Sequence, residues 1–213
     1  MINLNDLDKE KKILWSFWGD SFEGAGSKGH RYYHSLRVAQ NTLLIAEKAK
    51  LEITKNLIVA TLFHDIGKAE RVDSNGFLDG SREADEKMGD HNSQELVKKM
   101  IDKYLSDIYN EGDKKEVVEF ICSKDNIYSK LISDADNLDE VGLINVWKIF
   151  TYSGYKKVSI KDTVDYFFNN DLPRLTQKIE DYFFLQESKT IANERINSMT
   201  KFFKDFKKIA SLS

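Results

Sequence analysis

Apolar residues recur every three or four positions along most of the chain, which is the period of an amphipathic helix. In residues 30–50 the apolar stripe consists of Tyr33, Leu36, Ala39, Leu43, Ala46 and Ala49. The same spacing predicts helices at residues 3–19, 55–66, 91–109, 113–124, 126–137, 140–155, 160–186 and 189–209. Strict alternation of apolar and polar residues, which marks strands, is nearly absent. The pattern therefore predicts an all-α protein.

Few residues interrupt these helices. The chain has one proline, Pro173, whereas proteins built of many strands need frequent turn residues. Residues 22–29 and 68–90 are predicted to be loops, because the first is rich in Gly and the second in Gly, Asp and Ser. Thr54 is predicted to cap the start of the helix at 55–66, and Gly67 to end it. With 213 residues and no evident linker or repeat, residues 1–213 are expected to form one helical domain.

Charge and composition narrow the classes of partner. The 32 basic and 35 acidic residues give a net charge of −3, so nucleic acid is not an expected partner. The longest apolar run, residues 57–63, is far shorter than the roughly 20 residues that cross a bilayer. The single cysteine, Cys122, ends an apolar stretch and is expected to be a small buried hydrophobe. One cysteine and an acidic N-terminus unlike an export signal predict a cytoplasmic protein.

Candidate chemistry begins with the histidines. There are four, namely His30, His34, His64 and His91. His64 and Asp65 directly follow the apolar run, where a carboxylate is costly to desolvate unless it is paired or bound to a metal. One interpretation is that Asp65 forms an ion pair with Lys68 and that His64 is an ordinary interior histidine. The other is that both residues are metal ligands.

Two further segments favour the metal interpretation. His34 lies beside the apolar stripe of residues 30–50. An apolar pair is followed by three carboxylates, those of Asp134, Asp136 and Asp139. Carboxylates crowded at the edge of a core repel one another unless a cation offsets their charge. Spacing alone does not choose among the three, but the long separations exclude the closely paired ligands of a zinc finger.

The ordered set His34, His64-Asp65 and Asp136 resembles the H…HD…D signature of the HD-domain superfamily of metal-dependent phosphohydrolases. Residues 64–68 reproduce the HDIGK version of the central motif, and residues 134–142 resemble the DADRLDAIG segment of small stand-alone bacterial members. The resemblance extends into the C-terminal segment, residues 190–203. It implies an HD-domain helical bundle with a metal-binding core at about residues 30–140, on which C-terminal helices at about 160–210 pack.

By this resemblance, one divalent ion is held by His34, His64, Asp65 and Asp136. Two imidazoles with two carboxylates suit Mn²⁺, Fe²⁺, Co²⁺, Ni²⁺, Mg²⁺ or Zn²⁺. The expected reaction is hydrolysis of a phosphate ester, either a phosphomonoester or a nucleotide, by a water that the ion activates. The alternative is a module that binds a nucleotide or phosphate ligand without turnover. A second ion is not expected, because Ser123, Lys124 and Asp125 stand where the resemblance would need a further histidine.

Roles in substrate binding and proton transfer are also implied. Asp65, or another carboxylate near the site, is expected to help take the proton from the attacking water. Lys68 is expected to contact the phosphate, with a surface position or a pair with Glu70 as the alternative. Arg37 is expected to face the phosphate, or else to pack against an acid of its helix. His91 is expected to lie near the substrate or a second metal, or else to cap a helix or to be exposed.

Two expectations concern the surroundings of the site. The loop at residues 68–90 is predicted to cover the pocket. The apolar stripe of residues 189–209 can bury against its own bundle or against a second copy, so a homodimer is one expectation.

Overall fold

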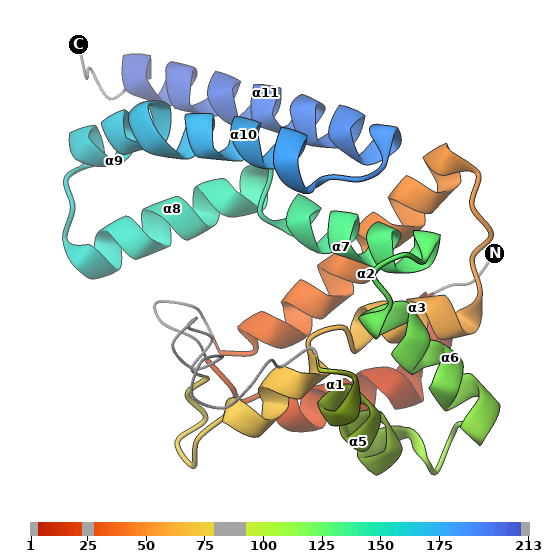
Figure 1. Cartoon of the computed structure of the whole chain (residues 1–213). Helices are drawn as coiled ribbons and strands as arrows, with labels where there is room; N and C mark the ends of the chain where they lie inside the picture. Colours follow the sequence, from red (N-terminus) through yellow and green to blue (C-terminus); the bar gives the residue numbers. More distant parts are fainter. Residues whose placement is uncertain (1–3, 23–27, 79–92, 210–213) are drawn as a thin grey trace. The chain divides into compact units, whose positions relative to one another are not determined.

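The structure is a computed structural model, and it describes residues 4–22, 28–78 and 93–209. In these ranges the regular structure is helical, with two isolated bridges, Phe22–Phe77 and Val72–Leu78 (Figure 1). The prediction of an all-α protein is confirmed. The chain divides into two compact units, Met1–Ile132 and Ser133–Ser213, and each is described separately. The single domain expected from the sequence stays a prediction.

The first unit is built around α3 (Lys55–Leu62), which packs against both α2 (His30–Ala49) and α6 (Glu111–Cys122) (Figure 1). All six residues from Leu57 to Leu62 are buried, because α3 has helices on more than one side. α1 (Asp8–Trp18), preceded by the short η1 (Leu4–Asp6), packs on α2, and α5 (Gln94–Leu105) packs on α6. The apolar run that precedes His64 is therefore the centre of this core.

Side-chain caps define where several of these helices begin. Thr54 accepts a hydrogen bond from the amide of Leu57 at 3.1 Å, which confirms the predicted cap of α3. Ser93 and Asn110 cap α5 and α6 in the same way. Each cap satisfies an amide that has no partner within its own helix.

The end of α3 differs from the prediction. The helix ends at Leu62, and a turn leads into the short 3₁₀ helix η2 (Ile66–Arg71). Nδ1 of His64 donates a hydrogen bond to the carbonyl of Thr61 at 2.8 Å. In a continuing α-helix that carbonyl would bind the amide of Asp65. Gly67 lies inside η2, so the prediction that it ends α3 was wrong.

The second unit is organised around α11 (Gln186–Ile209), which packs against α8 (Leu143–Lys156), α9 (Ile160–Tyr166) and α10 (Leu172–Tyr182) (Figure 1). Its predicted stripe is largely buried, with Ile191, Ile196, Met199 and Phe203 facing the core. The ring of Phe203 stacks on that of Phe167, with centroids 3.9 Å apart.

The helix predicted at residues 160–186 is interrupted. Between α9 and α10 lies a π-helical segment, η3 (Phe167–Asp171), and Pro173 follows at the start of α10. Proline has no N–H to donate and its ring crowds the carbonyl four residues earlier, so a regular α pattern does not continue through it. The wider turn of the π-helical segment before Pro173 accommodates the missing N–H and the crowded carbonyl.

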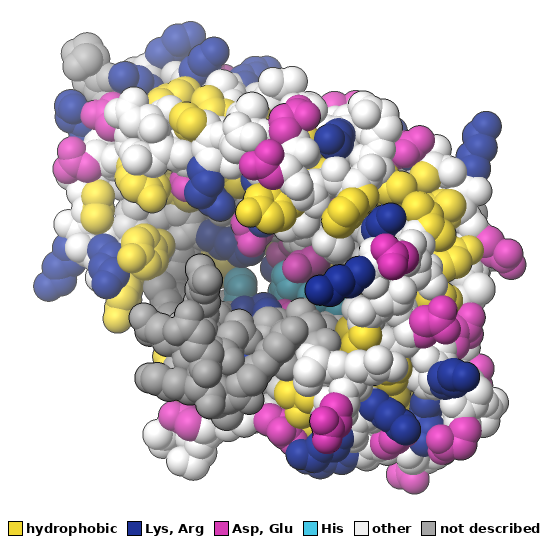
Figure 2. All heavy atoms as spheres, viewed as in Figure 1, with side chains coloured by type: hydrophobic (Ala, Val, Ile, Leu, Met, Phe, Trp, Pro, Cys, Tyr) yellow, Lys and Arg dark blue, Asp and Glu magenta, His cyan; other side chains and the backbone are white. Residues whose placement is uncertain are grey.

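The surface carries both signs of charge. On the face shown in Figure 2, lysine and arginine side chains are interspersed with aspartate and glutamate. Within the described ranges, no helix has both the length and the apolar character needed to cross a membrane.

Candidate metal centre

Two elements of the first unit bring three predicted ligands together. His34 lies one turn into α2, and His64 and Asp65 lie in the turn after α3. Nε2 of His34 and Nε2 of His64 are 3.8 and 3.7 Å from the same oxygen, Oδ2 of Asp65. The two imidazole rings have centroids 5.2 Å apart, and their ligand nitrogens lie within 4.8 Å of each other. All three side chains are buried.

This geometry fits a shared divalent ion. Neighbouring ligands of one ion, with bonds of about 2.1 Å, lie roughly 3 to 3.5 Å apart, so the observed separations need only small adjustments. The hydrogen bond from Nδ1 of His64 to the Thr61 carbonyl places the ring proton on Nδ1. Nε2 of His64 then carries the lone pair that a metal requires. The same bond that ends α3 thus orients this imidazole.

Two cations flank Asp65. Nη1 of Arg31 lies 2.7 Å from Oδ2, and Nζ of Lys68 lies 2.8 Å from Oδ1. The Asp65–Lys68 ion pair that one interpretation of the sequence predicts is therefore present. It does not exclude a metal, because a carboxylate has about four lone-pair positions on its two oxygens. Glu70 pairs instead with Lys99, at 2.8 Å.

Arg31 was missed by the sequence analysis. It lies three residues before His34, in the first turn of α2, so both residues share one face of the helix. That spacing was the one available signal. It was insufficient because nothing in the sequence shows that this face meets the turn containing Asp65.

The carboxylates of α7 (Ile127–Asp139) have different environments. Asp134 is fully buried and accepts hydrogen bonds from the amides of Phe184 and Leu185 at 2.9 and 2.8 Å. Burial raises the pKa of Asp134, although these two bonds oppose the shift. Asp139 is also buried, with Nζ of Lys148 at 3.6 Å from Oδ2. Two of the three residues between which spacing could not choose therefore have structural partners within the second unit.

Three further residues were predicted to belong to the site: Asp136, Arg37 and His91. Asp136 is half-buried on α7, in the second unit, so its position beside the histidines stays a prediction. Arg37 is half-buried on α2, one turn after His34. His91 and most of the loop predicted to cover the pocket lie outside the described residues.

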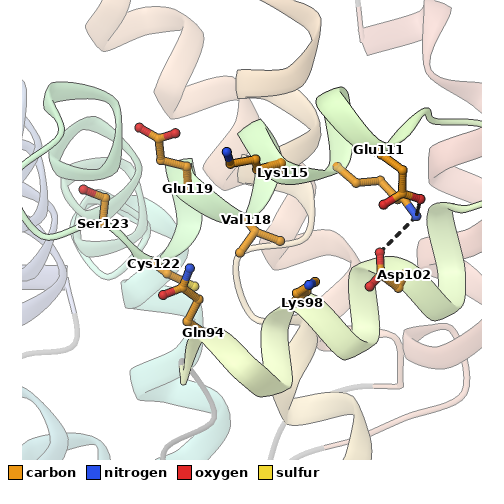
Figure 3. Close-up of a pocket in the computed structure, with 10 residues that line it drawn as sticks. Gln94, Lys98, Asp102, Glu111, Lys115, Val118, Glu119, Cys122 and Ser123 are labelled. Carbon is orange, nitrogen blue, oxygen red and sulfur yellow. Dashed lines mark ion pairs between the residues drawn. The ribbon is translucent and has the colours of Figure 1, made fainter.

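A separate cavity of about 630 Å³ lies between α5 and α6 (Figure 3). Its wall contains the buried Lys114, whose Nζ pairs with Asp102 at 3.0 Å and with Glu111 at 2.6 Å. Cys122 also lines the cavity and is half-buried, so the expectation that it is a buried residue was wrong. None of the predicted metal ligands lines this cavity.

Comparisons with solved structures show the same fold. The chain is similar to YpgQ of Bacillus subtilis in complex with ADP, with 19% identity, a TM-score of 0.62, and coverage of 96% of this chain and 95% of that one. An HD-superfamily hydrolase from Bacillus thuringiensis is 22% identical, with a TM-score of 0.63 and 99% of both chains covered. The Lin1889 protein of Listeria innocua is 22% identical, with a TM-score of 0.60, covering 100% of this chain and 99% of its own.

Sequence comparison supplies the family. No match is found among curated proteins. The profile of the HD domain matches residues 31–140, which is more than half of the chain and contains His34, His64, Asp65 and Asp136. The chain therefore belongs to the HD domain family.

Proposed function

We propose that this protein is a phosphohydrolase that uses one divalent metal ion to cleave a phosphate ester. The observation that carries the proposal is the convergence of two imidazole nitrogens on one carboxylate oxygen, with separations of 3.7 and 3.8 Å. Two cationic side chains lie against the same carboxylate, as a site for a negatively charged ester requires.

We propose Asp136 as the fourth ligand, beside His34, His64 and Asp65. Within the triplet on α7, both oxygens of Asp134 accept backbone amides, which disfavours Asp134 as the ligand. α7 is one uninterrupted helix, so Asp136 follows Ile132, the last residue of the first unit, by about one turn. The place of Asp136 in the family motif supports the same choice.

The ion would polarise the ester and lower the pKa of water at the site. The protein's own groups then have three tasks. His64 stays in one tautomer through its bond to Thr61, which keeps Nε2 available as a ligand. Asp65 would hold the ion and would help accept the proton from water. Lys68 and Arg37 would bind and orient the phosphate, and His91, which lies outside the described residues, is proposed to contact the substrate.

The substrate we propose is a small phosphorylated molecule, and a nucleotide is the leading case. The structurally similar YpgQ was solved in complex with ADP, which supports a nucleotide ligand here. The same observation also supports the alternative function, a module that binds a nucleotide without turnover. Measurement of hydrolysis separates the two. A homodimer is kept as a prediction, to be tested by light scattering during size-exclusion chromatography.

Metal analysis of the purified protein tests the proposal. The wild-type protein is compared with Asp136→Ala and with the control Glu140→Ala, which removes an exposed carboxylate that pairs with Lys178 at 2.8 Å and with Arg174 at 3.7 Å. Hydrolysis of p-nitrophenyl phosphate and of nucleotides is measured with Mn²⁺, Ni²⁺, Mg²⁺ and Zn²⁺ added.

About one ion per chain is expected in the wild type and the control, and its loss together with activity in Asp136→Ala. Metal without hydrolysis of any ester would favour the binding module. The absence of metal from the wild type, even after refilling, would refute the metal site.

A further inference from the structure

Asp65 lies between two cations that approach it from different elements. Arg31 reaches it from the first turn of α2, and Lys68 from η2, three residues further along the chain. Each cation takes a different oxygen, at 2.7 and 2.8 Å. The Arg31 and Lys68 side chains are only 14% and 16% exposed, so their charges are only weakly screened by water.

Counted over these groups, positive charge exceeds negative charge. Arg31 and Lys68 contribute two positive charges and Asp65 one negative charge. With a divalent ion and the proposed ligand Asp136 included, the net charge of the cluster is about +2 before the charge of Arg37 is added, since metal-binding histidines are neutral. A terminal phosphate dianion offsets more of this positive charge than a phosphodiester does, because a phosphodiester carries only one negative charge.

Arg31 contacts the same oxygen of Asp65 that faces the two histidines. Its Nη1 binds Oδ2 of Asp65, the oxygen toward which Nε2 of both histidines points. A phosphate oxygen on an ion at this point would therefore lie next to the guanidinium. A guanidinium presents several N–H donors in a rigid fork and commonly binds phosphate through two of them.

We infer that Arg31 binds the phosphate of the substrate and, with Lys68, makes the site prefer terminal phosphate monoesters over phosphodiesters. This inference rests on the proposed function, since it needs a metal and a phosphate at the same site. It adds a binding residue outside the HD motif, and it narrows the substrate class to molecules with a doubly charged terminal phosphate, such as nucleoside phosphates.

The competing role for Arg31 is to hold Asp65 in place. The two roles predict different results. Loss of a residue that only positions Asp65 would lower metal content and would reduce activity toward monoesters and diesters equally. Loss of a phosphate-binding residue would leave metal content unchanged and would weaken the binding of dianions far more than that of monoanions.

The test uses Arg31→Met and the milder Arg31→Lys in the full chain, loaded with Mn²⁺. Lys99→Met is the matched control, because it removes a cation that pairs with Glu70 of η2 on the surface, at 2.8 Å. Circular dichroism checks folding. The readouts are bound metal, the Kd of inorganic phosphate by calorimetry, and KM for p-nitrophenyl phosphate and bis(p-nitrophenyl) phosphate.

We expect Arg31→Met to keep its metal and to bind inorganic phosphate about 10- to 100-fold more weakly, the range for loss of a charge-assisted hydrogen bond. KM for the monoester should rise similarly and KM for the diester by less than about 3-fold, with intermediate values for Arg31→Lys and wild-type values for the control. An unchanged Kd for phosphate, equal losses for the two esters, or loss of the metal would overturn the inference. Phosphate binding needs no turnover, so weaker binding in Arg31→Met would support the inference even if the wild type hydrolysed nothing.

Discussion

Asp134 of α7 is expected to stabilise the fold and not to bind the metal. Its two oxygens accept the amides of Phe184 and Leu185, at 2.9 and 2.8 Å, in the segment that leads into α11. Asp134→Ala removes both acceptors, because the methyl side chain of alanine has no atom that can accept a hydrogen bond. The substitution is therefore expected to destabilise the second unit without removing a metal ligand.

The magnitude follows from the two bonds. A buried amide that loses its acceptor costs about 1–3 kcal/mol. Both amides of this pair are only partly buried, and burial of the carboxylate is itself unfavourable, as the raised pKa of Asp134 indicates. We therefore expect a total loss of about 2–4 kcal/mol for Asp134→Ala. Asp134→Asn keeps one acceptor but sets an NH₂ group against the second amide, so about 1–3 kcal/mol is expected.

Urea denaturation followed by circular dichroism measures the loss, and metal analysis below the transition measures the ion. Asp181→Ala is a suitable control, because this exposed carboxylate of α10 accepts a hydrogen bond from the exposed Gln177, at 2.9 Å. The control should change stability by less than about 0.5 kcal/mol. A folded Asp134→Ala protein that had lost its metal, or one as stable as the wild type, would refute the division of roles within the triplet.

Three further predictions concern other parts of the molecule. Tyr109→Phe should cost about 1.5–3 kcal/mol in urea denaturation, because Tyr109 donates a 2.5 Å hydrogen bond to the buried Glu10. Burial raises the pKa of Glu10, but the bonds from Tyr109 and Lys55 outweigh it and lower the pKa below its ordinary value. The stability that Glu10 contributes is therefore present above pH 4.5 and is lost as the pH falls through the lowered pKa, so the effect of Tyr109→Phe should shrink in acid. Phe203→Ala should destabilise the protein by about 3–5 kcal/mol in the same assay, since the buried ring stacks on Phe167; a loss below about 1 kcal/mol would contradict this packing. His64→Ala should lose the bound ion on metal analysis, and retention of one ion per chain would exclude His64 as a ligand.

Helix positions were largely predictable from the sequence because they depend on local patterns. The period of the apolar residues located α2, α5, α6, α7, α8 and α11 to within a few residues. The cap at Thr54 was readable for the same reason, since it involves residues three positions apart. Pro173 was visible too, but the sequence did not show that a π-helical segment would precede it.

The end of α3 was mispredicted because a side chain decided it. Gly67 is the conventional ending signal, yet Nδ1 of His64 reaches the carbonyl of Thr61 and the α pattern stops before Phe63. Helix propensity describes the backbone preference of each residue type. The bond from His64 depends instead on the side-chain rotamer of one imidazole in a packed core, which propensity does not describe.

The sequence by itself determined the helical class, the buried run before His64, and the residue types of the candidate site. It also indicated which segments carry the candidate ligands, because the order of the motifs can be read directly along the chain. Only the tertiary structure decided which charges meet. It placed Arg31 against Asp65, paired Asp134 with two backbone amides that lie 50 and 51 residues further along the chain, and brought two imidazoles to one carboxylate oxygen. These contacts join residues on different elements. The distances between such residues depend on how the elements pack against one another, and no local sequence pattern specifies that packing.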